Sequence, residues 1–212
     1  DFARWRRHPW HGLEAIPVGA DEGSVQAYIE MLPSDTVKYE LDKESGFLMV
    51  DRPQRTSATP PALYGFIPKT YCAEEVAKRC EGVTGADGDP LDICIYSERL
   101  INRADIILNA RVVGGIQMID GGEADDKIIA VLEGDNIWGG VTDIIDLPAI
   151  KTERLQHYFS TYKLIPGKTV NIKVDCVYGR EEALKVIEAA RNDYDNHYGN
   201  LFGDQAQMDL AS

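Results

Sequence analysis

Three aspartates, Asp87, Asp89 and Asp92, stand within six positions, and Gly88 and Pro90 lie between them. Carboxylates this close together repel one another unless a cation binds among them. The glycine and the proline favour a tight, non-helical backbone that fixes the carboxylates relative to one another. A fixed set of oxygen ligands is what a hard cation such as Mg²⁺ or Mn²⁺ requires. The motif therefore predicts a metal site.

A second acidic stretch begins at Asp120 and ends at Lys127, and it contains Glu123, Asp125 and Asp126. On one interpretation this stretch is a solvated loop between two strands. On the other, two acidic turns at strand ends converge on one face of a barrel and hold several metal ions. The sequence pattern alone leaves both interpretations open.

Cationic and phenolic side chains elsewhere in the chain could complete an anion site. Taken singly, each of these cations is more often a surface charge and each tyrosine a core aromatic. Together with metal-holding carboxylates they form the combination that a polyphosphate anion requires, because cations neutralise phosphate oxygens and a phenol donates a hydrogen bond. The candidates are Lys38, Arg52, Lys127, Lys163, Tyr64 and Tyr162.

Short strands make up most of the predicted elements. Runs rich in β-branched and aromatic residues predict strands over 25–32, 36–41, 47–50, 63–67, 93–96, 106–118, 127–132 and 169–178. A short surface helix is predicted over 73–80. A later helix is predicted to begin at Pro148, with Asp146 as its cap, and to end at Pro166-Gly167. The last helix is predicted over 181–194.

Apolar stripes at helical spacing predict which faces of the two late helices are buried. The stripes are Leu155, Tyr158, Phe159 and Tyr162 on the first helix, and Ala183, Ile187, Ala190 and Tyr194 on the second. The order of many strands, a helix, a strand and a helix predicts an α+β, mainly β fold. Its expected form is a small antiparallel barrel flanked by the two C-terminal helices.

The bulk properties exclude several classes of protein. A length of 212 residues predicts a single domain over 1–212, with 1–23 as an irregular N-terminal arm. The net charge of −13 argues against a nucleic-acid-binding surface, and no apolar run approaches the ~20 residues of a membrane span. The scattered cysteines match neither a zinc site nor a disulfide framework, which predicts a cytoplasmic location. Cys94 and Cys176 are predicted to be small core residues.

The stretch from Asp87 to Asp92 is similar to the signature of the family I soluble inorganic pyrophosphatases. Further matches follow in the family's order and extend the resemblance over roughly 28–194. They are Glu30, Lys38-Tyr39-Glu40-Leu41-Asp42-Lys43, Val50-Asp51-Arg52, Tyr64-Gly65-Phe66-Ile67, Asp120, Asp125, Lys127, His157-Tyr158-Phe159 and Tyr162-Lys163.

This resemblance implies a five-stranded, closed barrel of the oligonucleotide-binding type that serves an enzyme. It implies hydrolysis of pyrophosphate to two phosphates by a metal-activated water, with about three or four Mg²⁺ ions and Mn²⁺ as a possible substitute. By position, it assigns metal binding to Glu30, Asp87, Asp92, Asp120 and Asp125; the general base to Asp89; substrate binding to Lys38, Arg52, Tyr64, Lys127, Tyr162 and Lys163; and a supporting role to Glu40.

Three features depart from the commonest bacterial form of the family. Gly121 stands where an acidic residue often follows the metal-binding aspartate. The stretch 68–86 is a longer insert before the signature, and the arm over 1–23 is additional. The resemblance implies a homo-oligomer, but the insert and the arm leave its size, a hexamer or a dimer, open.

Other functions remain as alternatives. In a calcium-binding loop Asp87, Asp89 and Glu98 would take positions 1, 3 and 12, but Asp92 stands where that loop requires glycine. A non-catalytic barrel that binds oligonucleotides is possible because fold does not fix function, although the acidic charge counts against it. A phosphatase with an aspartyl nucleophile at Asp87 is a third alternative.

Overall fold

The computed structural model describes residues 6–165, 167 and 170–209, and for 200–209 it describes the backbone alone. The first five residues of the predicted arm lie outside the described residues. So do Pro166, at the predicted end of a helix, and Thr169, at the predicted start of a strand.

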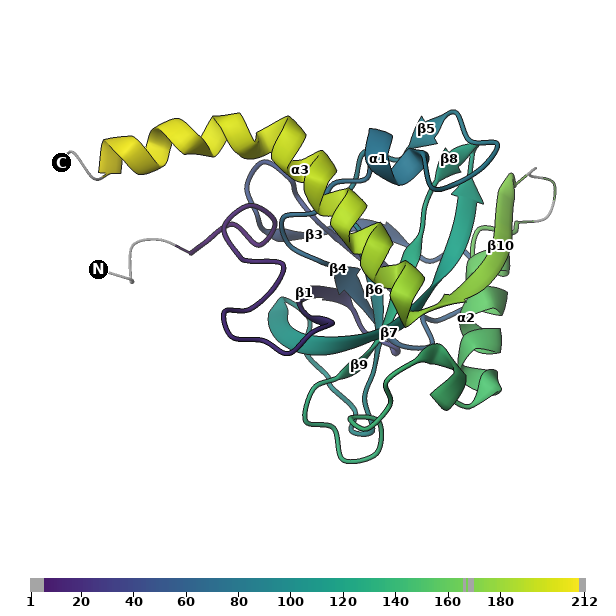
Figure 1. Ribbon diagram of the computed structural model, residues 1–212. Coiled ribbons are helices and arrows are strands. Elements are labelled where there is room, and N and C mark those ends of the chain that lie inside the picture. The colour runs from purple at the N-terminus through teal and green to yellow at the C-terminus, as the bar shows by residue number, and fades with distance from the viewer. Residues whose placement is uncertain (1–5, 166, 168–169, 210–212) are drawn as a thin grey trace.

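Five strands pair into a ring at the centre of the molecule (Figure 1). Going round the ring, the strands are β1 (Ser24–Met31), β4 (Leu63–Phe66), β6 (Asp92–Tyr96), β9 (Lys127–Leu132) and β7 (Ile106–Asp120), and β7 pairs with β1 again. The prediction of a mainly β fold is confirmed. The prediction of an antiparallel barrel is wrong for one pair of the ring, because β6 and β9 are parallel. The long connection from β6 through β7 supplies the crossover that a parallel pair needs.

The remaining strands extend the ring or lie beside it. β2 (Val37–Leu41) and β3 (Leu48–Pro53) form a hairpin, and β10 (Ile172–Gly179) pairs with β7. The two short strands β5 (Gly85–Ala86) and β8 (Glu123–Ala124) pair in parallel, so the end of the 68–86 insert lies next to the second acidic stretch.

Two helices pack on the strands, as predicted. α2 (Ala149–Thr161) lies beside β10, and α3 (Arg180–Asp209) runs across β7 (Figure 1). The stripe of α3 is buried at every predicted position, as are the first three residues of the α2 stripe, while Tyr162 is partly buried at the C-terminal cap of α2. α3 is longer than predicted, and α1 (Glu74–Ala77) is shorter.

The predicted cap at Asp146 is wrong. Asp146 belongs to a short 3₁₀ helix, η2 (Ile144–Asp146), and its carboxylate accepts from the backbone N–H groups of Thr142 and Asp143, which precede it. The Asp143 carboxylate accepts in return from the backbone N–H of Ile145. Both carboxylates therefore form a capping box for η2, and Asp146 does not cap α2. The N-terminal cap of α2 is Pro148, which makes no side-chain hydrogen bond.

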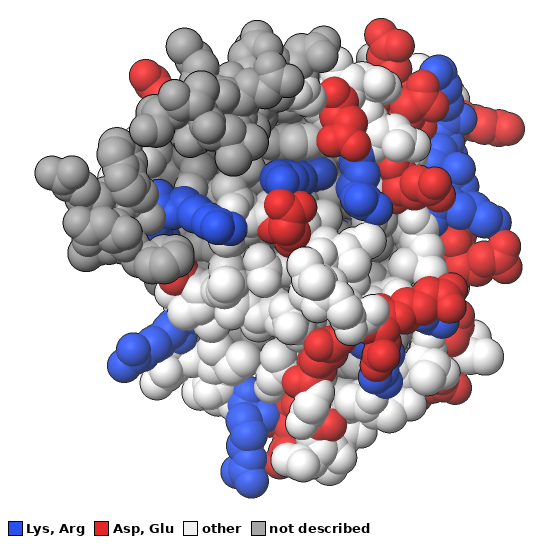
Figure 2. Space-filling model, turned by 60° about the vertical axis from the view of Figure 1, so that its left-hand side comes forward, with Lys and Arg blue, Asp and Glu red and all other residues white. Residues whose placement is uncertain are grey.

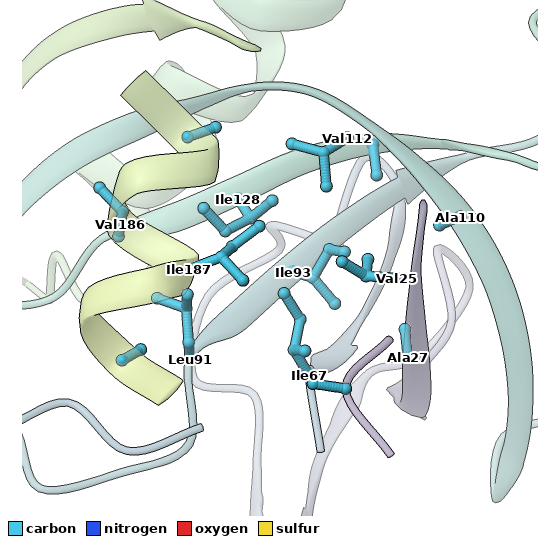
Figure 3. Close-up of a cluster of buried hydrophobic side chains, with 14 of the residues drawn as sticks. Val25, Ala27, Ile67, Leu91, Ile93, Ala110, Val112, Ile128, Val186 and Ile187 are labelled. Carbon is cyan, nitrogen blue, oxygen red and sulfur yellow. The ribbon is translucent and has the colours of Figure 1, made fainter. Parts of the chain in front are cut away.

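The core lies on both faces of the ring strands. On β6, Ile93 faces a cluster beneath α3, whereas Cys94 faces a second cluster beneath α2. Figure 3 shows the first cluster, with Ile187 of α3 packed toward Leu91, Ile93 and Ile128. Because β6 is covered on both faces, it reads in the sequence as a continuous apolar run. The strand after the acidic motif also argues against a calcium loop, whose flanks are helices.

The cysteine predictions are half correct. Cys94 is buried, but Cys176 is exposed on β10. All four cysteines are free thiols. Among the described residues, no helix combines the length and the apolar character that crossing a membrane requires.

The 68–86 insert is held against α3 by Asp193. This carboxylate is 4% exposed and accepts from the backbone N–H groups of Ala73 at 3.0 Å, Glu75 at 2.9 Å and Val76 at 3.0 Å. It therefore caps the start of α1 from a different helix. A second contact between the insert and α3 is made by Tyr71, whose backbone N–H donates to the carbonyl of Ala190 at 2.9 Å.

We expect Asp193→Ala to lower the free energy of unfolding by about 2–4 kcal/mol, because it leaves buried N–H groups without an acceptor. Urea unfolding followed by circular dichroism measures the change. Asp195→Ala, which alters an exposed aspartate on the same helix, is the matched control and is expected to change stability little. Equal stability of the two variants would contradict the capping role.

Candidate active site

The acidic motif forms a tight loop whose backbone is held by the insert. Gly88 has φ +72°, a conformation that favours glycine. The N–H of Gly88 donates to the carbonyl of Cys72 at 3.0 Å, and the N–H of Cys72 donates to the carbonyl of Asp89 at 2.8 Å. The N–H of Asp89 donates to Asp87 Oδ1 at 3.1 Å. The loop thus presents its carboxylates from a fixed frame.

Strand pairing brings the two acidic stretches together. Asp92, at the start of β6, lies opposite Lys127, at the start of β9. The Lys127 ammonium forms ion pairs with Asp92 and Asp125 and is 3% exposed. Asp120 stands at the end of β7 and lines the same cavity as Asp92, Asp125 and Lys127. The interpretation of 120–127 as only a solvated loop therefore fails, because Asp125 and Lys127 are buried.

Glu30 reaches the site from β1. It is 6% exposed, and the Leu41 backbone N–H donates to Glu30 Oε1 at 2.7 Å. Lys38 on β2 pairs with Glu40 at 2.9 Å and with Asp51 at 3.1 Å. The hairpin of β2 and β3 therefore supplies cations to the site, and its acidic residues orient them.

One cavity of about 250 Å³ collects these groups. Every site residue predicted from the sequence lines it: Glu30, Lys38, Glu40, Arg52, Tyr64, Asp87, Asp89, Asp92, Asp120, Asp125, Lys127, Tyr162 and Lys163. None of the predicted residues lies elsewhere. The structure shows their convergence, whereas the role of each residue stays a prediction.

The buried carboxylates of the cavity have raised pKa values, because they are removed from water and lie close to one another. Burial raises the pKa of Asp87 to about 8, and repulsion from Asp125 and Asp92 adds to the rise. Burial likewise raises the pKa of Glu30 to about 8 and raises that of Asp125. Burial alone lowers the pKa of Lys127, but Asp125 and Asp92 raise it well above the usual range. A cation placed among these carboxylates is strongly favoured.

The donor set fits a hard divalent cation. All the candidate ligands are carboxylates, and the Lys127 ammonium already lies between two of them as a cation. Within the part of the chain that the structure describes, no three acidic, cysteine or histidine side chains lie close enough together to coordinate one metal ion. An ion bound by Asp92 and Asp125 would compete with the Lys127 ammonium for the same carboxylates.

The cations opposite the carboxylates line the wall of the cavity. Arg52 pairs with Asp51, and Lys163 pairs with Asp120. The Lys163 ammonium also lies 5.3 Å from the centre of the Tyr162 ring. Tyr64 is partly buried, and this burial and the nearby Asp92 raise its pKa well above the usual range, so the phenol keeps its proton as a donor.

Four polar lining residues were not predicted as site residues: Lys43, Gln54, Glu123 and Tyr158. Lys43 forms an ion pair with Asp89. The sequence held a signal for it, because Lys43 belongs to the same matched stretch as Lys38. Tyr158 was predicted as core only, and it is buried and also lines the cavity.

A ring of strands that carries a carboxylate cluster faced by lysine, arginine and tyrosine is the arrangement that binding of a phosphate-containing anion through metal ions requires. A family model described as inorganic pyrophosphatase matches residues 27–195. The chain belongs to the inorganic pyrophosphatase family, which confirms the resemblance found in the sequence.

Individual relatives agree with this assignment. The inorganic pyrophosphatase of Chlamydia muridarum is 48% identical over 89% of this chain and 94% of its own. The soluble inorganic pyrophosphatase 2 of Chlamydomonas reinhardtii is 38% identical over 90% of each chain. The solved structure of the Helicobacter pylori inorganic pyrophosphatase is 36% identical, with a TM-score of 0.70 over 86% of this chain and 99% of that one.

Proposed function

We propose that this chain hydrolyses inorganic pyrophosphate to two phosphates and depends on several Mg²⁺ ions. The observation that carries the proposal is the single cavity in which all the predicted metal, substrate and base residues meet. The names of the relatives support the same substrate.

The metal-binding residues in this proposal are Glu30, Asp87, Asp92, Asp120 and Asp125. When bound, divalent ions lower the pKa of water by several units and neutralise phosphate oxygens. Without such cations the substrate would be repelled, because two like unit charges ~4 Å apart repel by about 4 kcal/mol at an effective dielectric near 20. Several such terms would act on a pyrophosphate in this cavity.

Asp89 is proposed to take the proton of the attacking water. Its side chain is half exposed, and its backbone is fixed by Asp87 and Cys72. It can therefore hold a water in line with the phosphorus and pass the proton to solvent. No covalent intermediate is needed, because direct attack by water suffices for phosphoryl transfer.

The cationic wall is proposed to bind the two phosphates. Lys127, Lys163 and Tyr162 offset the charge that builds on the leaving phosphate as its bond breaks. Lys38 and Arg52 hold the other phosphate, and the residues that support them are Tyr64, as a protonated phenol, and Glu40, which pairs with Lys38.

Phosphate release tests this proposal. We expect the purified chain to release phosphate from pyrophosphate with Mg²⁺, to lose at least about a hundredfold in rate with a chelator, and to recover when Mg²⁺ is restored. ATP and p-nitrophenyl phosphate serve as control substrates and are expected to react far more slowly. Phosphate release that is equally fast in the chelator would contradict the metal dependence.

The proposal extends to the finer fold and the setting of the protein. We infer that the ring is a closed barrel of the oligonucleotide-binding type within one domain over 1–212, and that the chain forms a homo-oligomer in the cytoplasm. The free thiols fit a reducing compartment. On the described part of the face in Figure 2, basic side chains are interspersed with acidic ones, which supports a role other than nucleic-acid binding.

A further inference from the structure

Lys43 is a cation of the cavity that the resemblance to the family did not assign. It lies in the turn between β2 and β3, lines the cavity and forms an ion pair with Asp89. Its side chain is 42% exposed and that of Asp89 is 40% exposed. Ion pairs this exposed contribute little to folding stability, so the fold does not require this contact. The side chain is long and free enough to exchange Asp89 for another anion.

The turn that carries Lys43 is rigid. The N–H of Gly46 donates to the carbonyl of Asp42 at 2.8 Å, and the N–H of Asp42 donates to the carbonyl of Phe47 at 2.9 Å. The N–H of Ser45 also donates to Asp42 Oδ2 at 3.0 Å. These bonds fix the backbone of Lys43, so its reach into the cavity depends on where the whole turn lies.

The N-terminal arm fixes the position of the turn. His8 and Pro9 pack against Gly46 so closely that a Cβ there would lie 2.7 Å from His8 Cδ2 and 3.1 Å from Pro9 Cδ. The His8 ring is oriented in turn, because its Nδ1 accepts from the backbone N–H groups of Trp10 at 3.2 Å and His11 at 3.3 Å. His8 is therefore the contact between the arm and the turn.

The same arm is fastened to the loop that carries Asp89. Trp10 is 2% exposed, and its Nε1 donates to the carbonyl of Thr70 at 2.7 Å. The hydroxyl of Thr70 accepts from the N–H of Leu91 at 2.9 Å. The arm thus connects the Lys43 turn with the acidic loop.

We propose that Lys43 is a further phosphate-binding residue of this site and that His8 is the positioning residue that sets its reach. In the free cavity the Lys43 ammonium pairs with Asp89. When pyrophosphate enters, the ammonium moves to a phosphate oxygen and leaves the Asp89 carboxylate free to accept a proton. This inference rests on the proposed function and adds one substrate contact to it.

The first test compares Lys43→Gln with the unchanged chain in the presence of Mg²⁺. We expect KM for pyrophosphate to rise about tenfold, as for the loss of one charge-assisted contact, while kcat changes less than about threefold. The dissociation constant of imidodiphosphate, measured by calorimetry, is expected to rise by a similar factor. Lys43→Arg is expected to recover most of the affinity.

The matched control is Lys78→Gln. Lys78 is an exposed lysine that pairs with Glu75 and does not line the cavity. This variant removes the same charge and is expected to leave KM and the imidodiphosphate affinity unchanged. A rise in KM as large as that of Lys43→Gln would mean that net charge alone draws in the substrate, and it would overturn the proposal.

The second test joins His8 to Lys43 by a double-mutant cycle. His8→Ala is expected to raise KM about threefold, and His8→Ala with Lys43→Gln to bind no worse than Lys43→Gln alone, because His8 acts through Lys43. Additive losses in the double variant would overturn the positioning role. Thermal melts of all variants separate these effects from unfolding.

The outcomes separate this inference from the proposed function. If the unchanged chain releases no phosphate from pyrophosphate, the proposed function fails. If the unchanged chain is active and Lys43→Gln leaves both KM and the imidodiphosphate affinity as they were, the Lys43 inference alone fails. A loss in kcat without a change in affinity would also overturn it, because Lys43 would then act on Asp89 and not on the phosphate.

Discussion

Asp92→Asn is expected to lower pyrophosphate turnover by at least about a hundredfold, because it removes a charge from the carboxylate cluster that we propose holds the metal. Asp92 is held in place by the pairing of β6 with β9, opposite Lys127. Steady-state phosphate release at saturating Mg²⁺ measures the loss.

The control for this prediction is Asp175→Asn. Asp175 is exposed on β10, pairs with Lys173 and lies outside the cavity. The same change of charge is expected to leave turnover unchanged there. Full activity of Asp92→Asn would remove Asp92 from the metal site.

Asp89→Asn is expected to separate chemistry from metal binding. The variant loses the proposed proton acceptor, so kcat is expected to fall about 10²–10⁴-fold. Mg²⁺ affinity, measured by calorimetry, is expected to change only a few-fold, because Asp89 pairs with Lys43 and takes no part in the cluster around Lys127.

The comparison with Asp92→Asn makes this second prediction sharp. Asp92→Asn is expected to weaken Mg²⁺ binding and turnover together, whereas Asp89→Asn weakens turnover alone. If Asp89→Asn loses Mg²⁺ affinity and rate to the same extent, Asp89 is a metal ligand and another group must accept the proton.

Local patterns predicted most of the elements well. The apolar stripe of α3 is buried at every predicted position, since a 3.6-residue period depends only on neighbours along the helix. Cys176 is exposed because the pairing of β10 with β7 shifts register between Val174 and Cys176, so that Val174 and Val177 face the core and Cys176 does not. Burial of a strand depends on what packs over it, and no local pattern reports that.

For the site, too, local patterns predicted some features, and others depend on how distant segments pack together. Asp87, Asp89 and Asp92 were found from their spacing, and resemblance named the other residues. The contact between Asp92 and Lys127 depends on the register of β6 with β9, which spacing alone does not give. Lys43 belongs to a stretch that matches the family, but its contact with Asp89 was not predicted, since that contact follows from how the turn, the arm and the acidic loop pack together.

The most direct test of the whole account is a crystal structure with Mn²⁺, in which anomalous scattering locates the ions. We predict that ions lie between the side chains of Asp87, Asp92, Asp120 and Asp125, and that Lys127 gives up part of its pairing with Asp92 and Asp125. Carboxylates that keep their pairing with Lys127 at saturating Mn²⁺, with no anomalous peak among them, would contradict the account.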